Sequence, residues 1–399
     1  MIVGGDLAAL LGANGCVVLV DSHARAAHAR PIGLDSSLAM ADEEDKENWA
    51  SMAEAFDFGD EESKPRVSSR LLPVPSLDAA SSSAAAPESI DATARRFAAE
   101  FRAKSPCVTR RVAEPWMSSS RLGREGGDGV FGPRGPARHL PAVLLHASRD
   151  DATFLGRGDL CRRREGVPAE EAWARVRDGG GGTGAERCYL RLPLGPELWA
   201  DLDFRPAAAL ARGAQNSDRV DDRSPGGGPP PPFSSRTASV WASSPGCVTP
   251  LHFDLCHGFL TQIRGRKRAL LVPPEHTRSL HRNPPGDANP NSSRVNLPLW
   301  LDGEGTEAGE AERRRHPRVA NAIGEIFEVI ISPGETLYIP PFWWHHVRTL
   351  DDREGEDGEG EGEAGASVSV LLAFDPDPDE SVHPCVEDGS CFWMGGAEG

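Results

Sequence analysis

The chain lacks long apolar runs and closely spaced pairs of cysteines, and each absence excludes a class of protein. Its 399 residues contain no stretch of about 18 apolar residues, so we expect no membrane-spanning helix and no membrane partner. The eight cysteines form no C-x-x-C pair and no zinc-ribbon spacing, and they are too sparse for a disulfide framework. These features predict a reducing intracellular compartment, either the cytoplasm or the nucleus.

The chain also lacks a basic footprint, because its formal net charge is −17. Most of that charge lies in two segments. Residues 42–63 hold ten acidic residues and one lysine, and residues 351–363 hold eight acidic residues and one arginine. The remainder is close to neutral. A general nucleic-acid-binding surface needs clustered basic residues, so the composition does not support one.

Composition divides the chain into four parts. Residues 1–90 are acidic and then rich in Ser and Ala, and we expect them to be largely disordered. Residues 91–236 are expected to support the fold, with a Gly/Pro-rich insertion at 213–236. Residues 376–399 are expected to form an irregular tail. Within the supporting part, the patterns predict helices in 91–104 and 170–176 and strands in 140–145 and 187–192.

Residues 237–375 have a different texture, because short apolar runs alternate with turn signals. Several short strands at close spacing are typical of a β-sandwich or barrel. We therefore expect a mainly β core in this part of the chain.

The segment Thr-Pro-Leu-His-Phe-Asp, residues 249–254, contains two residue types that bind metals. Side chains alternate between the faces of a strand, so His252 and Asp254 would lie on the same side. A third ligand is best sought in the segment 338–347, which contains His345. Two histidines and one carboxylate form the facial triad of non-haem Fe(II) oxygenases, which leaves positions open for a co-substrate and O₂.

Plainer interpretations stand beside the metal site. A His-x-Asp triplet also arises by chance, and a histidine near tryptophans is often only packed. On a regular strand His346 points away from His345, so we interpret it as lying behind the ligands or on the surface. Cys256 and His257 lie past the expected strand end and are interpreted as structural or substrate-facing residues.

The segment 259–274 predicts a hairpin with its turn at Arg264-Gly265. Lys267 begins the second strand. A buried lysine is costly unless an anion meets it, and the distal carboxylate of a co-substrate would be such an anion. The alternative is an ordinary turn lysine. We expect the neighbouring arginines to remain in solvent: Arg264, Arg266 and Arg268.

Three motifs together resemble the jumonji-C (cupin-like) hydroxylases, and most of all the asparaginyl hydroxylase factor inhibiting hypoxia-inducible factor and its small relatives. The motifs are Thr249–Asp254, Phe259–Pro274 and Ser332–His345. The likeness covers residues 237–374 and extends more weakly back to about residue 140. It implies a double-stranded β-helix, that is, a jelly-roll or cupin-like barrel, with flanking helices.

The resemblance also implies roles for particular residues and a set of cofactors. Fe(II) would be held by His252, Asp254 and His345. The 5-carboxylate of the co-substrate 2-oxoglutarate would be contacted by Lys267, Thr249 and Tyr189. For Tyr189 the alternative is an ordinary strand tyrosine. O₂ would complete the reaction.

Two positions depart from the family pattern. The family often has Asn or Gln shortly after the His-x-Asp motif, where this chain has His257 and Gly258. It commonly has Asn near the last strand, where Leu371 stands. We therefore expect the contacts near the 1-carboxylate of the co-substrate to differ from those of the family.

The resemblance implies a 2-oxoglutarate-dependent oxygenase that hydroxylates a protein side chain and releases succinate and CO₂. Hydroxylation of a modified tRNA base and lysine demethylation use the same chemistry and stay open. So do a cupin-like metal-binding module without activity and a cupin enzyme that needs no co-substrate. The expected partner is a protein or peptide substrate, with tRNA as the alternative, and the oligomeric state is not predicted.

Overall fold

The structure is a computed structural model, and the residues that it describes all belong to one of the two units of the chain, formed by residues 10–18 and 70–399. Its described residues are 10–11, 17–18, 71–78, 89–119, 122, 143–148, 162–179, 186–212, 233, 237–284, 287, 289–351 and 366–381. Near the N-terminus, the strands β1 (Leu10–Leu11) and β2 (Val17–Val18) pair antiparallel. The insertion predicted at 213–236 lies outside the described residues except for Phe233, and so does most of the second acidic segment.

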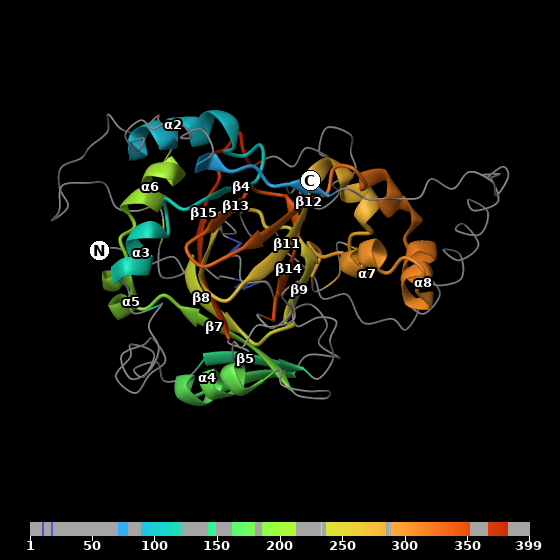
Figure 1. Cartoon of the computed structure of the whole chain (residues 1–399), viewed down its shortest axis with the longest axis horizontal. Helices are drawn as coiled ribbons and strands as arrows, with labels where there is room; N and C mark the ends of the chain where they lie inside the picture. The colour runs from blue at the N-terminus through green and yellow to red at the C-terminus, as the bar shows by residue number, and fades with distance from the viewer. Residues whose placement is uncertain are drawn as a thin grey trace, which may run out of the picture. The chain divides into compact units, whose positions relative to one another are not determined.

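Two β-sheets form the body of this unit (Figure 1). The larger sheet has the order β4–β13–β10–β15–β8–β7–β5–β6, and the smaller has the order β3–β12–β11–β14–β9. From β8 to β15, most successive strands, such as β10 and β11, lie in different sheets, as the predicted jelly-roll barrel requires. The strands of the larger sheet are β4 (Cys107–Thr109), β5 (Val143–Ser148), β6 (Arg162–Val167), β7 (Arg187–Pro193), β8 (Ala238–Ser243), β10 (His257–Arg264), β13 (Thr336–Ile339) and β15 (Ser367–Phe374). Those of the smaller sheet are β3 (Leu72–Pro73), β9 (Val248–His252), β11 (Lys267–Val272), β12 (Phe327–Ile331) and β14 (Trp344–Thr349).

The turn between β10 and β11 lies at Arg264-Gly265, as predicted. The predicted hairpin is wrong, because β10 pairs with β13 and β15 in the larger sheet and β11 pairs with β12 and β14 in the smaller one. Gly265 has a φ of +67°, a conformation that side chains disfavour. A Cβ there would also lie 3.1 Å from the backbone of Ser367. Apolar side chains from both sheets fill the barrel: Leu260, Ala269, Leu271, Ile331, Leu337, Ile339, Trp343 and Val347.

An ordered segment, residues 71–78, closes one side of the barrel. Its strand β3 runs parallel to β12, and Ser76 then bridges to Val108 in β4. Leu77 follows with 1% of its surface exposed. The expectation of disorder up to residue 90 is therefore wrong for this segment, because its backbone completes both sheets.

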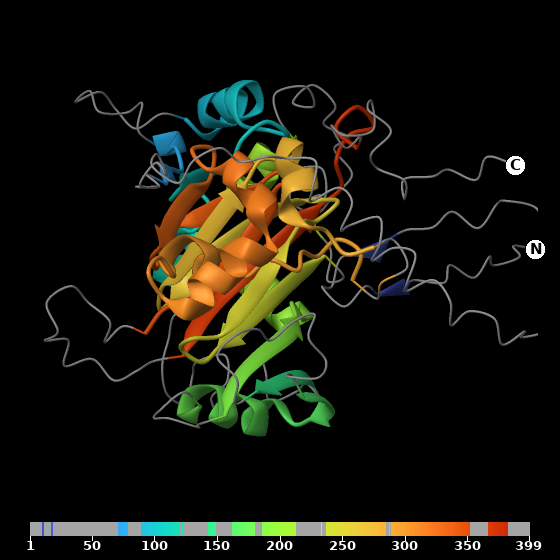
Figure 2. The same ribbon diagram turned by 90° about the vertical axis from the view of Figure 1, so that its right-hand side faces the viewer.

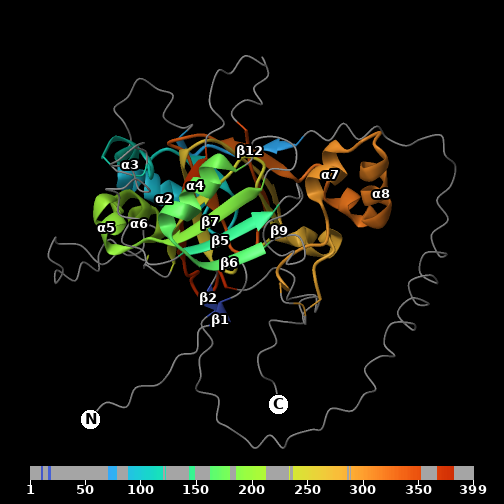
Figure 3. The ribbon, with the colours of Figure 1, turned by 90° about the horizontal axis from the view of Figure 1, so that it is seen from below.

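Helices cover the larger sheet on one side, where α2 and α6 pack together (Figure 1). At the lower end of the molecule in that view, α4 packs on β7, and Figure 3 shows it beside β5 and β6. The predicted helices and strands of residues 91–236 are present, and the strand expected at 140–145 begins three residues later, at Val143. The helices are α2 (Ile90–Glu100), α3 (Glu114–Ser119), α4 (Ala169–Asp178), α5 (Pro196–Asp201) and α6 (Arg205–Arg212).

A helical insertion between β11 and β12 was not predicted. It packs on the outer face of the smaller sheet. In Figure 2 the insertion lies in front of that sheet. Its apolar residues, including Leu297 and Trp300, meet Val272 and Trp344 from the sheet. The insertion contains η6 (Pro274–Leu280), α7 (Leu297–Asp302), α8 (Glu307–Arg315) and η7 (Pro317–Ala322).

The environment of Arg268 differs from the prediction. Arg268 was expected in solvent, but its guanidinium lies 2.5 Å from Glu328 and 2.8 Å from Asp302, with 19% of the side chain exposed. The helical insertion supplies Asp302, which the strand pattern could not reveal.

Among the described residues, none of the helices has the length and apolar character needed to cross a bilayer.

Candidate metal centre

Two adjacent strands of the smaller sheet bring the predicted histidines together. His252 is the last residue of β9, and it pairs directly with His345 of β14. Both side chains are buried, and their ring centroids are 4.1 Å apart. With Asp254, each offers a ligand atom within 4.8 Å of the others. The structure therefore brings the three predicted residues to one point.

Asp254 reaches this point in a way that differs from the prediction. We expected His252 and Asp254 to share a strand, but β9 ends at His252. Asp254 lies in the loop that follows. Its Oδ2 is 3.8 Å from Nε2 of His345, and its Oδ1 is buried without a hydrogen-bond partner among the described residues. A buried carboxylate oxygen without a partner is costly unless a cation meets it.

Backbone carbonyls fix the orientation of both imidazoles. Nδ1 of His252 donates to the carbonyl of Pro250 at 2.7 Å, and Nδ1 of His345 donates to that of Trp343 at 2.9 Å. The Nε2 atoms are therefore free to act as acceptors or ligands. Burial and the neighbouring His252 lower the pKa of His345 to about 4, so its ring is neutral near pH 7. Neutral imidazoles oriented by carbonyls are the usual form of metal-binding histidines.

The donor set fits a ferrous ion. Two imidazole nitrogens and one carboxylate on one side of a cavity match the facial triad, and they leave the other side open. A structural zinc site would close the shell with a fourth protein ligand. Within the part of the chain that the structure describes, no fourth such residue joins the group.

Cationic and hydroxyl groups gather elsewhere in the same cavity. Lys267 is 1% exposed, and its Nζ lies 5.6 Å from the ring centre of Tyr189. The Thr249 hydroxyl donates to that of Tyr189 at 3.5 Å. Burial lowers the pKa of Lys267 to about 8 and raises the pKa of Tyr189. The alternative of a solvent-exposed turn lysine is therefore wrong.

One cavity of about 70 Å³ joins the two groups. All the site residues predicted above line it: Tyr189, Thr249, His252, Asp254, Lys267 and His345. Seven further residues line it. Cys256 was interpreted above as structural or substrate-facing, and Gly258 and Leu371 as departures from the family pattern. The prediction did not include the other four: Trp241, Leu260, Ile339 and Val347. Strand alternation could have found some of them, since Leu260 lies two residues after Gly258 and Val347 two after His345.

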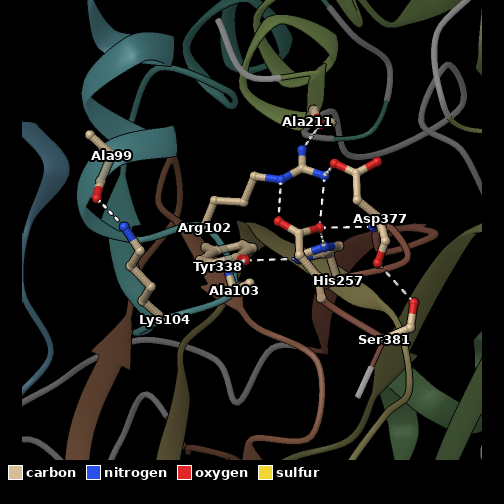
Figure 4. A network of polar contacts seen from close by, with 10 residues as sticks. Ala99, Arg102, Ala103, Lys104, Ala211, His257, Tyr338, Asp377 and Ser381 are labelled. Atoms are coloured by element: carbon tan, nitrogen blue, oxygen red, sulfur yellow. Dashed lines mark hydrogen bonds and ion pairs between the residues drawn. The ribbon is translucent and has the colours of Figure 1, made fainter. Parts of the chain in front are cut away.

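The neighbouring histidines have structural contacts. His346 is 6% exposed, so the surface interpretation of that residue is wrong. His257 is fully buried; its Nδ1 lies 2.8 Å from the Tyr338 hydroxyl and its Nε2 3.0 Å from Glu380. Figure 4 shows Arg102 completing this network by binding the same carboxylate. The start of the tail, expected to be irregular, is thereby tied to the barrel.

Comparison with known sequences gives the family. The profile of the Cupin-like domain matches residues 97–380. The chain belongs to the cupin-like domain family. The match covers both sheets of the barrel except β3, so it confirms the predicted fold and the likeness to jumonji-C proteins.

Relatives of this cupin-like protein include jumonji-C proteins. Jumonji C domain-containing protein 5 of Drosophila melanogaster is 32% identical over 112 residues, which is 28% of this chain and 24% of that protein. Lysine-specific demethylase 8 of Xenopus tropicalis is 33% identical over 117 residues, or 29% and 23% of the two chains. The chain thus spans about a quarter of the length of these relatives.

Among solved structures, the Escherichia coli ribosomal oxygenase YcfD is similar to this cupin-like protein, with 15% identity and a TM-score of 0.32. The match covers 71% of this chain and 52% of that chain.

Proposed function

We propose that this cupin-like protein is an Fe(II)- and 2-oxoglutarate-dependent oxygenase that hydroxylates a protein side chain. One observation carries the proposal: a His-Asp-His set and a buried lysine line the same cavity. The first would hold the metal, and the second would meet the far carboxylate of a dicarboxylate co-substrate. Membership of a family that includes jumonji-C relatives supports this assignment.

The metal end would be formed by Nε2 of His252, Nε2 of His345 and the Asp254 carboxylate. Fe(II) held there would supply the redox chemistry by which O₂ oxidises 2-oxoglutarate to succinate and CO₂ and inserts oxygen into a C–H bond. These residues would hold the metal in one place, because backbone carbonyls fix the orientation of both imidazoles. The barrel walls would limit the access of water to the reacting atoms.

The other end would bind the co-substrate. The Lys267 ammonium would pair with the 5-carboxylate, and the hydroxyls of Thr249 and Tyr189 would donate to it. Such an anion would satisfy a buried cation that no carboxylate meets among the described residues. The apolar lining between the ends, including Leu260 and Val347, would contact the methylene groups.

A succinate-release assay tests the proposal. The iron-loaded full chain is incubated with 2-oxoglutarate and O₂, alone and with candidate peptides, methylated peptides or tRNA. We expect succinate from the wild type, stimulated by a peptide, and none from His252→Ala. Mass spectrometry of the peptide distinguishes a gain of oxygen from loss of a methyl group, and stimulation by tRNA alone would favour base hydroxylation.

One observation favours a second candidate, a metal-binding module without turnover. Leu371 and Gly258 line the cavity near positions where the jumonji-C family often has amide side chains, so this chain would offer fewer hydrogen bonds to the co-substrate. Iron-loaded wild type that binds metal but releases no succinate, even with 2-oxoglutarate in excess, would support that module and overturn the oxygenase. We retain a reducing compartment, the cytoplasm or the nucleus, as the proposed location.

A further inference from the structure

The loop that carries the carboxylate ligand is held by the helical insertion. Residues 291–293 of the insertion run antiparallel to the end of β9. The amide of Ser293 donates to the carbonyl of Leu251 at 2.9 Å, and His252 bridges to Ser292. The insertion thus adds an edge segment beside the strand that bears the first histidine.

Asn291 ends this ladder with its side chain. The backbone carbonyl of Asn291 accepts from the backbone amide of Phe253 at 3.0 Å. The side-chain Nδ2 of Asn291 donates to the backbone carbonyl of Phe253 at 2.7 Å. In a continuing antiparallel ladder, a backbone N–H would make the second bond. The side-chain amide of Asn291 takes that role at the point where β9 has stopped.

A second donor holds the other side of Asp254. The amide of Phe342 donates to the carbonyl of Asp254 at 2.7 Å. Phe342 has a φ of +65°, which is strained for an aromatic residue, while its ring is buried 6.2 Å from that of Phe253. The two peptide planes that flank the Cα of Asp254 are therefore each fixed by one hydrogen bond.

We propose that Asn291 is a positioning residue for the metal ligand Asp254. Because Asp254 lies outside the strand, its backbone angles depend on these two bonds and not on a sheet ladder. The role of Asn291 rests on the proposed metal site and goes beyond it by assigning a function to the insertion. Groups that orient metal ligands typically change metal affinity by about 10–100-fold when removed.

Metal affinity of the full-length chain tests this role. Mn(II) titration, followed by the electron paramagnetic resonance of the free ion, gives a dissociation constant without turnover. We expect Asn291→Asp, which keeps the shape but loses the donor, and Asn291→Ala to bind Mn(II) about tenfold more weakly than the wild type. Thermal unfolding of the metal-free proteins identifies any variant that fails to fold.

Asn283 offers a matched control. Its Nδ2 donates to the carbonyl of Asn289 at 3.0 Å, in the same insertion but not to either peptide that flanks the Cα of Asp254. We expect Asn283→Ala to bind Mn(II) like the wild type. An equal loss in Asn283→Ala, or wild-type affinity in both Asn291 variants, would overturn the positioning role.

A double-mutant comparison separates positioning from general support. If Asn291 acts through the carboxylate, Asn291→Asp should have little further effect on residual binding in an Asp254→Ala background. An undiminished tenfold loss in that background would contradict the proposal. Failure of the wild type itself to bind Mn(II) would instead contradict the proposed metal site, so the two failures are distinct.

Discussion

The two ends of the cavity are supported by different parts of the structure. At the lysine end, Lys267 is paired on both sides, with Ile331 of β12 and Thr349 of β14. Tyr189 is likewise held between two strands. At the metal end, His252 is the last residue of β9, and Asp254 lies in the loop that follows. Sheet ladders thus position the lysine end and both histidines, whereas a loop and the insertion position Asp254. The carboxylate ligand should therefore be more sensitive to distant substitutions than the other site residues.

Removal of a ligand at the metal end should have the largest effect. His345→Ala leaves one imidazole and one carboxylate, so we expect Mn(II) affinity to fall by more than about 100-fold, above the loss from an orienting residue. Equilibrium dialysis measures it, with His346→Ala as the neighbouring control. Similar losses in both variants would show that the strand, and not the ligand, had been damaged.

Removal of the cation should affect the other end alone. Lys267→Met keeps the apolar stem but loses the ammonium, so we expect 2-oxoglutarate to bind about 100-fold more weakly, ~2.7 kcal/mol. Mn(II) affinity without co-substrate should stay near that of the wild type. Calorimetry measures both. Unchanged 2-oxoglutarate affinity would favour a cupin enzyme that needs no co-substrate.

The pH dependence of co-substrate binding sharpens the comparison further. Burial holds the pKa of Lys267 at about 8 in the free protein, and a bound carboxylate would raise it. Affinity should therefore be constant below pH 8 and then fall by up to about tenfold per pH unit as the free protein loses this proton. Titrations at pH 7, 8 and 9 test it. A slope that persists in Lys267→Met would show that another group is responsible.

The smallest effect is expected between the two ends. Leu371 is half-buried in the cavity wall, where it packs against two clusters of core residues, and Leu371→Asn would place a hydrogen-bonding group beside the co-substrate. A neutral bond contributes about 1 kcal/mol, so we expect 2-oxoglutarate to bind about fivefold more tightly. Leu371→Val is the control. A weaker complex in the Asn variant would show that the apolar wall itself favours the co-substrate.

The sequence pattern predicted the barrel and the two histidines because strand periodicity and turn signals are local. The role of Lys267 was inferred from the resemblance to the family. Its burial could not be predicted from its position, because it directly follows a turn. The hydrogen bonds that fix the backbone at Asp254 were not predicted, because their donors, Asn291 and Phe342, are remote in sequence. The pairing of His257 with Glu380 was missed for the same reason, since 123 positions separate the partners.

The bridge between Ser76 and Val108 ties the segment 71–78 to the larger sheet, and β3 ties it to the smaller one. A truncated protein that starts at residue 91 would lose β3 and leave the neighbouring edges of β4 and β12 without their partner. Uncovered strand edges recruit other chains, so we expect this truncation to aggregate, while one that starts at residue 70 stays in solution. Sedimentation of the two truncated proteins would compare them. Domain boundaries drawn from composition alone would therefore cut into the barrel.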